Sequence, residues 1–323
     1  MTALLQFHNQ NLFTTKTVRE LLFDGYRVNV LDTINLISMP LKIIGISIPY
    51  VPLINNTFGI FHNKNNTPEG PFEVFTGIDD YTKIGQFVAW KDKVSLNHWK
   101  GKECNVLNGT DGIQFSPFLK KEQILSVFIF DACRSILLGF DKETEVKGIK
   151  TYRFKTLQSS FHSATKNSDN WCYCNVRKKS CNHDGVIDIS PCWFNAPLYA
   201  SHPHFYNASK RIFEKVKGLQ PDGEKHTSYV DIEPTTGSVL RGARRFALNV
   251  EIKNFPIISS SRNILKPAII PILWVEESSQ LSDELRDEMN SKLFMTKMVA
   301  EVGIKFLIAA GFALLSIVLR TSK

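Results

Sequence analysis

Residues 170–192 read NWCYCNVRKKSCNHDGVIDISPC and contain four of the 6 cysteines in this chain of 323 residues. The other two, Cys104 and Cys133, come before this stretch, and no cysteine follows it. Cysteines gathered in one region either bind a metal as thiolates or pair as disulfides, depending on the redox compartment. Fold and location therefore both depend on the chemistry of these residues.

Zinc is the first interpretation. Structural zinc sites usually place about two to four residues between paired cysteines. Here Cys172 and Cys174 are separated by one residue, which is not the usual spacing. His183, His202 and His204 follow in the sequence and could complete a ligand set. This interpretation corresponds to a tail-anchored cytosolic zinc-binding interaction protein.

Disulfide pairing is the second interpretation. The cysteine count is even, and four N-x-[ST] sequons, which are acceptors for N-glycosylation, occur in the chain. Most of them lie in segments rich in turn-forming residues, where a glycan would be exposed. The sequons begin at Asn55, Asn65, Asn108 and Asn207. Together with a membrane anchor, these features favour an oxidising compartment.

The C-terminal region contains the predicted anchor. Residues 306–319 read FLIAAGFALLSIVL and carry no charge. A membrane-spanning helix needs about 20 residues, and extension back to Met298 provides this length while including Glu301 and Lys305. We predict a transmembrane helix over 298–319, an extracellular or lumenal ectodomain over 1–297 and a cytoplasmic tail over 320–323.

The composition excludes some function classes. Hydrophobic residues make up 43% and charged residues 22%, as in a globular protein. The net charge of +8 is scattered, and residues 177–179 and Arg241 with Arg244 and Arg245 form the only tight basic clusters. No nucleic-acid motif accompanies them, so we interpret both clusters as solvated surface.

Hydrophobic periodicity predicts a β-rich body with few helices. Residues 17–26 should form a short helix ending at Gly25, and 73–90 a hairpin. Residues 121–140 look helical at first and then mixed. Residues 146–157, 242–255 and 266–277 should be strands, with Phe246, Leu248, Val250 and Ile252 on one face. A charged helix should begin after Ser282.

No catalytic motif is present: the chain has no GxSxG, P-loop, GxGxxG or HExxH pattern. The carboxylate pairs are interpreted as turn and surface groups rather than acid–base pairs. These pairs are Asp79 with Asp80, Asp231 with Glu233, and Glu276 with Glu277. The sequence thus predicts a protein that is not an enzyme and needs no cofactor or metal.

Several motifs in order along the chain resemble the class B scavenger receptor family, which includes the fatty acid translocase, croquemort, the sensory neuron membrane proteins and the lysosomal integral membrane protein. They are TVRELLFDGY (17–26), CNVLNGTDG (104–112), DACRSI (131–136), NWCYC (170–174), GVIDISPC (185–192), SHPHFYNAS (201–209), DIEPTTG (231–237) and PILWVEE (271–277).

The resemblance implies an α+β fold, in which an antiparallel β-barrel-like ectodomain with helical decorations encloses a lipid tunnel, plus one C-terminal transmembrane helix. It also implies three disulfides. These are Cys104–Cys172, Cys133–Cys192 and Cys174–Cys181.

The resemblance further implies a first membrane span and about a third of an ectodomain before residue 17. This agrees with residues 1–13, which lack the features of a signal peptide. The four residues after Leu319 contain no sorting motif. We therefore expect the plasma membrane rather than the lysosomal membrane.

The resulting functional hypothesis is a cell-surface scavenger receptor that binds lipids, fatty acids or lipoprotein particles and transfers lipid toward the membrane. Two alternatives within the family are a chemosensory lipid receptor and a lysosomal membrane receptor. We expect no nucleic-acid partner, and a homo-oligomer remains open. The sequence identifies no ligand-binding residue.

Overall fold

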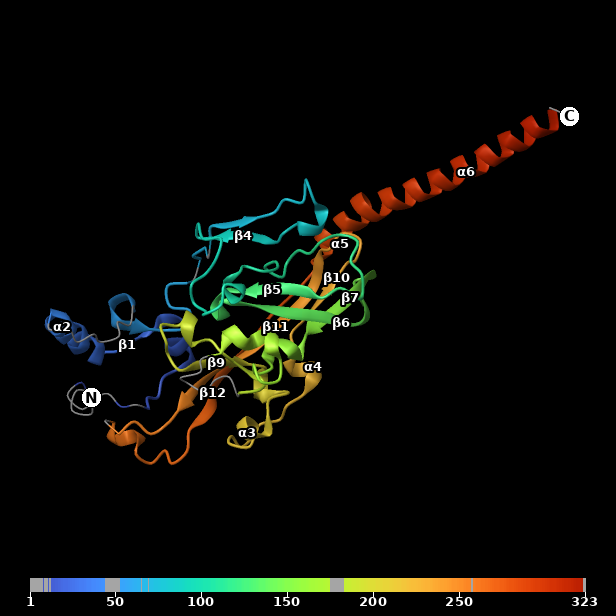
Figure 1. Cartoon of the computed structure of the whole chain (residues 1–323). Coiled ribbons are helices and arrows are strands. Elements are labelled where there is room, and N and C mark those ends of the chain that lie inside the picture. Colours follow the sequence, from blue (N-terminus) through green and yellow to red (C-terminus); the bar gives the residue numbers. More distant parts are fainter. Residues whose placement is uncertain are drawn as a thin grey trace.

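A computed structural model describes residues 8, 11, 13–43, 53–64, 66–68, 70–174, 183–256 and 258–321. The body contains one main sheet, together with two small two-stranded sheets and short helices. A long helix extends away from this body (Figure 1). The main sheet has eight strands. They are β5 (Leu125–Ile129), β6 (Arg134–Val146), β7 (Ile149–Thr156), β8 (Val186–Asp188), β9 (Leu198–Ser201), β10 (Tyr229–Ile232), β11 (Val239–Ile252) and β12 (Ala268–Gln280).

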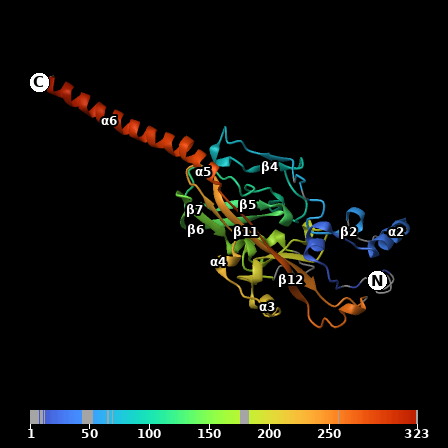
Figure 2. The same ribbon diagram turned by 180° about the vertical axis from the view of Figure 1, so that it is seen from behind.

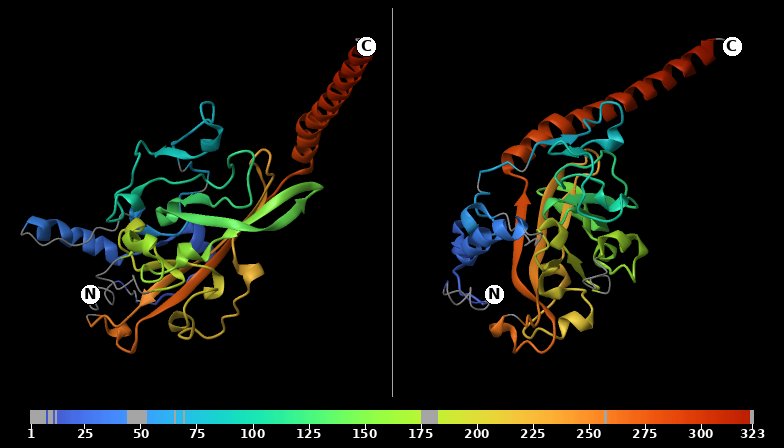
Figure 3. Two further views of the ribbon diagram at one scale, coloured as in Figure 1. Left: turned by 45° about the vertical axis from the view of Figure 1, so that its right-hand side comes forward. Right: turned by 60° about the vertical axis from the view of Figure 1, so that its left-hand side comes forward.

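Strand β11 is the centre of this sheet. It pairs with β12 over residues 241–252, so the two long strands cross the body side by side (Figure 3). Since a strand has only two edges, its other edge is divided between β10, opposite 239–243, and β9, opposite 247–250. The sheet therefore forks at residues 244–246, with one branch through β10, β7, β6 and β5 and the other through β9 and β8.

A side chain supplies the hydrogen bonds at the fork. The N–H of Arg245 donates to the hydroxyl of Ser228 at 2.8 Å, and this hydroxyl donates to the carbonyl of Arg245 at 3.0 Å. Because buried backbone groups must find partners, Ser228 replaces the missing strand where the two branches separate.

The expectation of a barrel is met only in part. Every strand pair of the main sheet is antiparallel. Within the described ranges, however, no pairing joins the outer strands β5, β8 and β12 to one another. The sheet in this part of the chain is open and forked.

The prediction of helix at the start of 121–140 is wrong. Strands β5 and β6 occupy most of this segment and form a hairpin in which Leu125 faces Leu138. Leu125 and Val127 alternate into a core cluster that also contains Phe154 and Ile232. The segment is short and rich in β-branched and aromatic residues, so the period of a strand, not of a helix, decides its structure.

Several other sequence predictions are confirmed. The hairpin over 73–90 contains β3 (Phe72–Val74) and β4 (Phe87–Trp90), which are antiparallel. Strands β7 and β11 lie where alternation predicted them, and β12 lies where the apolar segment 266–277 predicted a strand. The helix expected over 17–26 is the turn η1 (Glu20–Asp24), which Gly25 ends with φ +76°. A left-handed residue of this kind favours glycine because it has no Cβ.

Of the residues expected on one face of β11, Leu248 is buried, whereas Phe246, Val250 and Ile252 are half-buried. Leu248 packs with Ile187 and Ile189 in one core cluster. Ala247 and Asn249, on the opposite face, are also buried, at 1% and 0% exposure. Neighbouring elements cover both sides of β11 at this point, which a single strand sequence does not reveal.

Strand β12 contains a bulge. Leu248 pairs with Leu273 but Asn249 pairs with Pro271, so Ile272 has no partner residue on β11. Pro271 has no backbone N–H and cannot complete a regular ladder. The bulge accommodates this proline inside a long strand.

The C-terminal region is helical. The hydroxyl of Ser282 accepts the N–H of Leu285 at the start of α5 (Asp283–Met289), and η13 (Asn290–Phe294) leads into α6 (Met295–Thr321). Among the described residues this is the one helix long and apolar enough to cross a membrane, and its apolar window is 0% buried. Side chains such as Phe306, 72% exposed, require a nonpolar surrounding. The predicted span 298–319 lies within α6.

The N-terminal part lies at the opposite end of the body from α6. Figure 2 shows α2 (Val30–Ile43) and β2 (Thr57–Phe58) on this side, and Figure 1 shows β1 (Tyr26–Arg27) there. The loop between β11 and β12 lies at the same end (Figure 1). Two short helices, α3 (Lys210–Phe213) and α4 (Gly223–His226), lie between β9 and β10 along the chain.

Candidate functional site

One disulfide of the structure links Cys104 to Cys172. Cys104 lies in the turn η4 (Glu103–Asn105) and Cys172 in η7 (Ser168–Tyr173), with their Cα atoms 6.0 Å apart. Both are buried in a small cluster with Trp99, whose ring lies edge-on to Tyr173 with centroids 5.1 Å apart. This contact fixes the turn that carries Tyr173 against the loop before β5.

A second disulfide links Cys133 to Cys192, with Cα atoms 5.9 Å apart. Two indoles hold the backbone around Cys133. Nε1 of Trp99 donates to the carbonyl of Cys133 at 2.6 Å, and Nε1 of Trp193 donates to the carbonyl of Asp131 at 2.7 Å. The start of β6 is therefore held from two sides.

Cys174 is also disulfide-bonded. Cys181, its expected partner, lies outside the described residues. The two bonds above connect the pairs that the sequence resemblance implies, and the third pair stays a prediction.

Three of the four sequon asparagines lie in the described part of the chain. Asn55, Asn108 and Asn207 are all exposed. The carbonyl of Asn108 accepts the hydroxyls of Ser126 and Ser135, so its backbone is fixed while its side chain faces solvent. Asn65 lies outside the described residues. Exposure is the geometry that glycan attachment requires.

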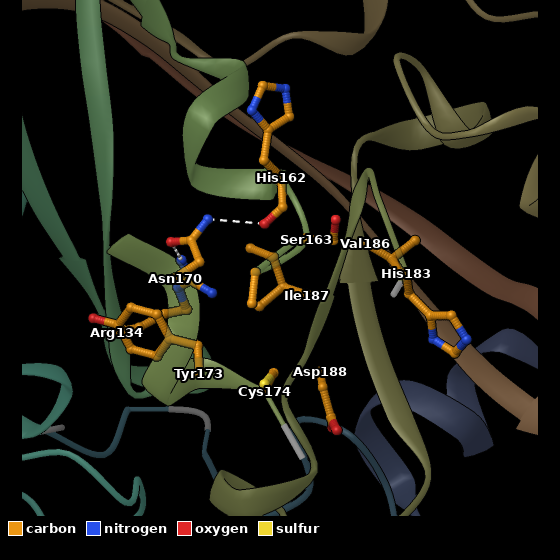
Figure 4. Close-up of a pocket in the computed structure, with 11 residues that line it drawn as sticks. Arg134, His162, Ser163, Asn170, Tyr173, Cys174, His183, Val186, Ile187 and Asp188 are labelled. Carbon is orange, nitrogen blue, oxygen red and sulfur yellow. Dashed lines mark hydrogen bonds between the residues drawn. The ribbon is translucent and has the colours of Figure 1, made fainter. Parts of the chain in front are cut away.

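Arg134, which follows Cys133, is a buried cation that the sequence reasoning missed. Its Nη2 donates to the carbonyl of Ser160 at 3.0 Å and to Oδ1 of Asn170 at 3.1 Å (Figure 4). The guanidinium carbon lies 3.8 Å from the ring centroid of Tyr173, a cation–π contact. Burial lowers the pKa of Arg134 to about 10, so it stays charged at neutral pH.

A small cavity of about 20 Å³ lies beside Arg134, between Tyr173, Cys174 and Asp188 (Figure 4). It has room for a water molecule rather than a lipid. A larger cavity, of about 260 Å³, is lined by mostly polar groups, including Lys155 and Gln158. Since ligand pockets usually measure about 300–1,000 Å³, neither cavity forms a lipid tunnel.

His202 forms part of the wall of the larger cavity. Its ring is 2% exposed and lies 4.3 Å from the ring of Phe161, centroid to centroid. Burial lowers the pKa of His202 to about 4, so the ring is neutral at pH 7. Its Nδ1 is buried without a hydrogen-bond partner. Protonation of His202 is therefore unfavourable in the folded protein.

The comparisons with known proteins decide the family. The model of the CD36 family matches residues 1–321 of this chain. The chain belongs to the CD36 family. Lysosome membrane protein 2 of Rattus norvegicus is 32% identical over 300 residues, which cover 93% of this chain. Scavenger receptor class B member 1 of Sus scrofa is 32% identical over 317 residues, or 98% of this chain.

In both comparisons the matched part is 59% of the relative. The human lysosome membrane protein 2 gives the same coverage at 32% identity. The chain thus spans less than two thirds of the length of these CD36-family relatives. With its family and its apolar helix α6, it is a CD36-family membrane protein.

The zinc interpretation finds no site in the described part of this CD36-family chain. No three side chains of histidine, cysteine, aspartate or glutamate converge there in a way that could hold a metal. The sulfur of Cys104 is bonded to that of Cys172, and the sulfur of Cys133 to that of Cys192. None of the four can therefore act as a thiolate ligand.

The basic cluster of β11 is not free surface. Arg241 pairs with Asp231 at 2.6 Å, Arg244 with Glu277 at 2.8 Å, and Arg245 with Glu276 at 2.6 Å. Each cation thus has an acidic partner within the fold of this CD36-family protein. Residues 177–179 lie outside the described residues.

The interpretation of Asp231 as a surface group is wrong. Its side chain is fully buried and accepts from Nε and Nη2 of Arg153 at 2.7 and 2.8 Å and from Nε of Arg241 at 2.6 Å. Burial raises the pKa of Asp231, but hydrogen bonds from Arg153 and Arg241 outweigh it, so the net pKa is lowered. It is a structural ion pair.

Glu233 agrees with the turn interpretation, although it is buried. Its carboxylate accepts the N–H groups of Thr235 and Thr236 at 3.0 and 2.7 Å. These bonds close the turn between β10 and β11 within the DIEPTTG motif. Asp80 is used in a similar way, since it accepts the N–H of Thr82 at 3.0 Å.

Proposed function

We propose that this chain is part of a cell-surface scavenger receptor that binds lipids, fatty acids or lipoprotein particles and transfers lipid toward the membrane. The observation that carries the proposal is the CD36-family match over residues 1–321, together with the similarity to scavenger receptor class B member 1. The apolar helix α6 supports a membrane anchor for such a receptor.

The proposed arrangement places residues 1–297 outside the cell, 298–319 in the bilayer and 320–323 in the cytoplasm. The two disulfides of the described region support an oxidising surrounding for the body. The exposure of Asn55, Asn108 and Asn207 supports the same side, because glycans are attached in the secretory pathway.

Lipid transfer in this proposal needs an enclosed apolar path. Burial of apolar surface contributes about 25 cal/mol per Å², so a lipid chain is held by area alone and needs no catalytic group. We propose that the open, forked sheet forms one wall of a barrel-like enclosure. Residues of the full-length protein outside this sheet would then supply the remainder.

A lysosomal membrane receptor is the alternative that a specific observation favours. Lysosome membrane protein 2 of three mammals matches this chain at 31–32% identity. A chemosensory lipid receptor has no such observation and rests on the sequence resemblance alone. Surface biotinylation of intact cells, compared with colocalisation in lysosomes, separates the plasma membrane from the lysosome.

The test of the main proposal uses the full-length protein on cells that lack it. Expression should increase the uptake of fluorescent fatty acid, sterol or lipoprotein. A Cys133→Ser variant, which loses one disulfide, is the loss-of-fold control. Surface biotinylation must show that the wild-type protein reaches the cell surface. If surface-exposed wild-type protein gives no more uptake than the control, the proposal fails.

A further inference from the structure

Two neighbouring loops carry large apolar side chains on their outer surface. The first is the β3–β4 loop, in which Ile78 is 87% exposed and Tyr81 is 55% exposed. The second precedes β5, and in it Ile113 and Phe118 are 70% and 65% exposed. We call these four residues the apolar rim. Exposed apolar groups gathered in this way mark an interaction surface.

The two loops are in contact with each other. The rings of Tyr81 and Phe118 meet edge to face, with centroids 5.9 Å apart. The loop of Ile113 is itself tied to the main sheet, because its carbonyl accepts the N–H of Val239 at 3.3 Å. The rim is therefore one surface that is held in place by β11.

Two carboxylates of the loops that carry the rim, those of Asp80 and Asp111, are used inside these loops. Oδ1 of Asp80 accepts the N–H of Thr82 at 3.0 Å, and Oδ1 of Asp111 accepts the N–H of Ile113 at 2.9 Å. Lys83 pairs with Asp80 at 3.4 Å. These carboxylates close their own turns, and the aliphatic side chains of the two loops face outward.

The rim lies at the end of the body from which α6 emerges. Val239, which contacts Ile113, begins β11, and the carbonyl of the next residue, Leu240, accepts the N–H of Leu281 at 2.7 Å. Helix α5 begins two residues after Leu281. The β3–β4 hairpin and the base of α6 lie at this end in Figures 1 and 2.

The helix beside the rim indicates what covers it. Val302, Phe306 and Leu307 of α6 are 60%, 72% and 70% exposed, and a bilayer supplies the nonpolar surroundings that such a helix needs. The rim lies at the same end of the body as α6, so a bilayer around α6 faces this end of the body. Aromatic and aliphatic side chains on a surface of this kind enter the zone between headgroups and acyl chains.

We propose that the apolar rim rests on the lipid bilayer and inserts Ile78 and Ile113 into its interfacial zone. The body then has two contacts with the membrane, α6 and the rim, and these fix the tilt of the ectodomain. The inference goes beyond the proposed function, because it requires a membrane span but no particular ligand or uptake activity.

The test measures the surroundings of single side chains in the full-length protein, reconstituted in phosphatidylcholine nanodiscs. Ile78→Cys and Ile113→Cys would each carry the fluorophore NBD. The structure leaves no free cysteine among the residues it describes, so the introduced thiol is the target. Leu265→Cys is the matched control, since Leu265 is 91% exposed and lies between β11 and β12, at the opposite end.

NBD at positions 78 and 113 should emit at shorter wavelength than NBD at 265, and nanodiscs with spin-labelled lipid should quench it. Equal, unquenched emission at all three positions would overturn the proposal. A shift to shorter wavelength without quenching by lipid would also overturn it, because it would assign the rim to a protein contact. Both readouts are independent of lipid uptake, so failure here is distinct from failure of the receptor function.

Discussion

The imidazole rings of His204 and His226 stack with centroids 4.6 Å apart, and both lie against Trp274. Nδ1 of His204 accepts the N–H of Gln220 at 3.1 Å, and Nδ1 of His226 accepts the N–H of Asp222 at 2.9 Å. A nitrogen that accepts a hydrogen bond cannot carry a proton. Protonation of both rings would break two bonds and place two cations in contact.

Acid should therefore destabilise this region. Burial lowers the pKa of His202 from 6.5 to about 4. The pKa of His226 is also lowered from 6.5, mainly by burial and secondly by the charge of His204. A histidine with a lowered folded-state pKa contributes stability that is complete above the unfolded value and is lost as the pH falls below it. We expect the melting temperature to fall between pH 6.5 and pH 4. Protonation of His202 should lower the free energy of unfolding by about 3 kcal/mol over this range.

The measurement is thermal unfolding of the protein in detergent at several pH values. His202→Gln, which cannot be protonated, should reduce the dependence on pH even if it lowers stability at pH 7. His98→Gln, at an exposed position, is the control. A pH slope that is the same in the wild type and in His202→Gln would contradict this account.

Loss of the buried carboxylate of Asp231 should be costly. In Asp231→Asn, Arg153 and Arg241 keep their charges but lose the anion between them. Breaking a buried ion pair in this way costs about 3–5 kcal/mol. Chemical denaturation measures the loss. Glu276→Gln is the matched control, because this carboxylate is 38% exposed and its pair with Arg245 should contribute about 0–1 kcal/mol. Equal losses in the two variants would refute the distinction.

The Cys104–Cys172 disulfide should stabilise the fold by restricting the unfolded chain. It joins residues 68 apart, which corresponds to about 4 kcal/mol as an upper estimate. Replacement of both residues with alanine should lower the free energy of unfolding toward this value under non-reducing conditions. Peptide mapping without reduction checks the pairing directly. Alkylation of Cys104 in unreduced, denatured protein would show that the bond is absent.

Glycosylation at Asn207 can be tested with three changes at one sequon. Asn207→Gln and Ser209→Ala both destroy the acceptor, so each should lower the apparent mass by one glycan. Ser209→Thr keeps the acceptor and should leave the mass unchanged. The hydroxyl of Ser209 makes no capping hydrogen bond to α3, so threonine can replace it. Electrophoresis before and after glycosidase treatment is the measurement, and no mass difference among the three variants would refute the site.

Local patterns were sufficient for elements that depend on neighbouring residues. Strict alternation located β7 and β11, the turn formers between residues 74 and 87 predicted the β3–β4 hairpin, and Ser282 marked the start of α5. The uncharged run over 306–319 predicted the apolar helix. The segment over 121–140 was misread because its apolar residues fit a helical period locally, whereas pairing of β5 with β6, and of β6 with β7, makes it a sheet.

Residues 306–319 and the ordered motifs from VRELL to PILWVEE were enough to predict a membrane anchor and the family, because both depend on composition and order along the chain. Tertiary structure alone showed that Asp231 is a buried anion between two arginines, that Arg134 is a buried cation against Tyr173, and that the loops of Ile78 and Ile113 meet near the start of β11. Such features depend on residues that are far apart in the chain and close in space, and burial changes the energy of a charge more than its sequence neighbours do.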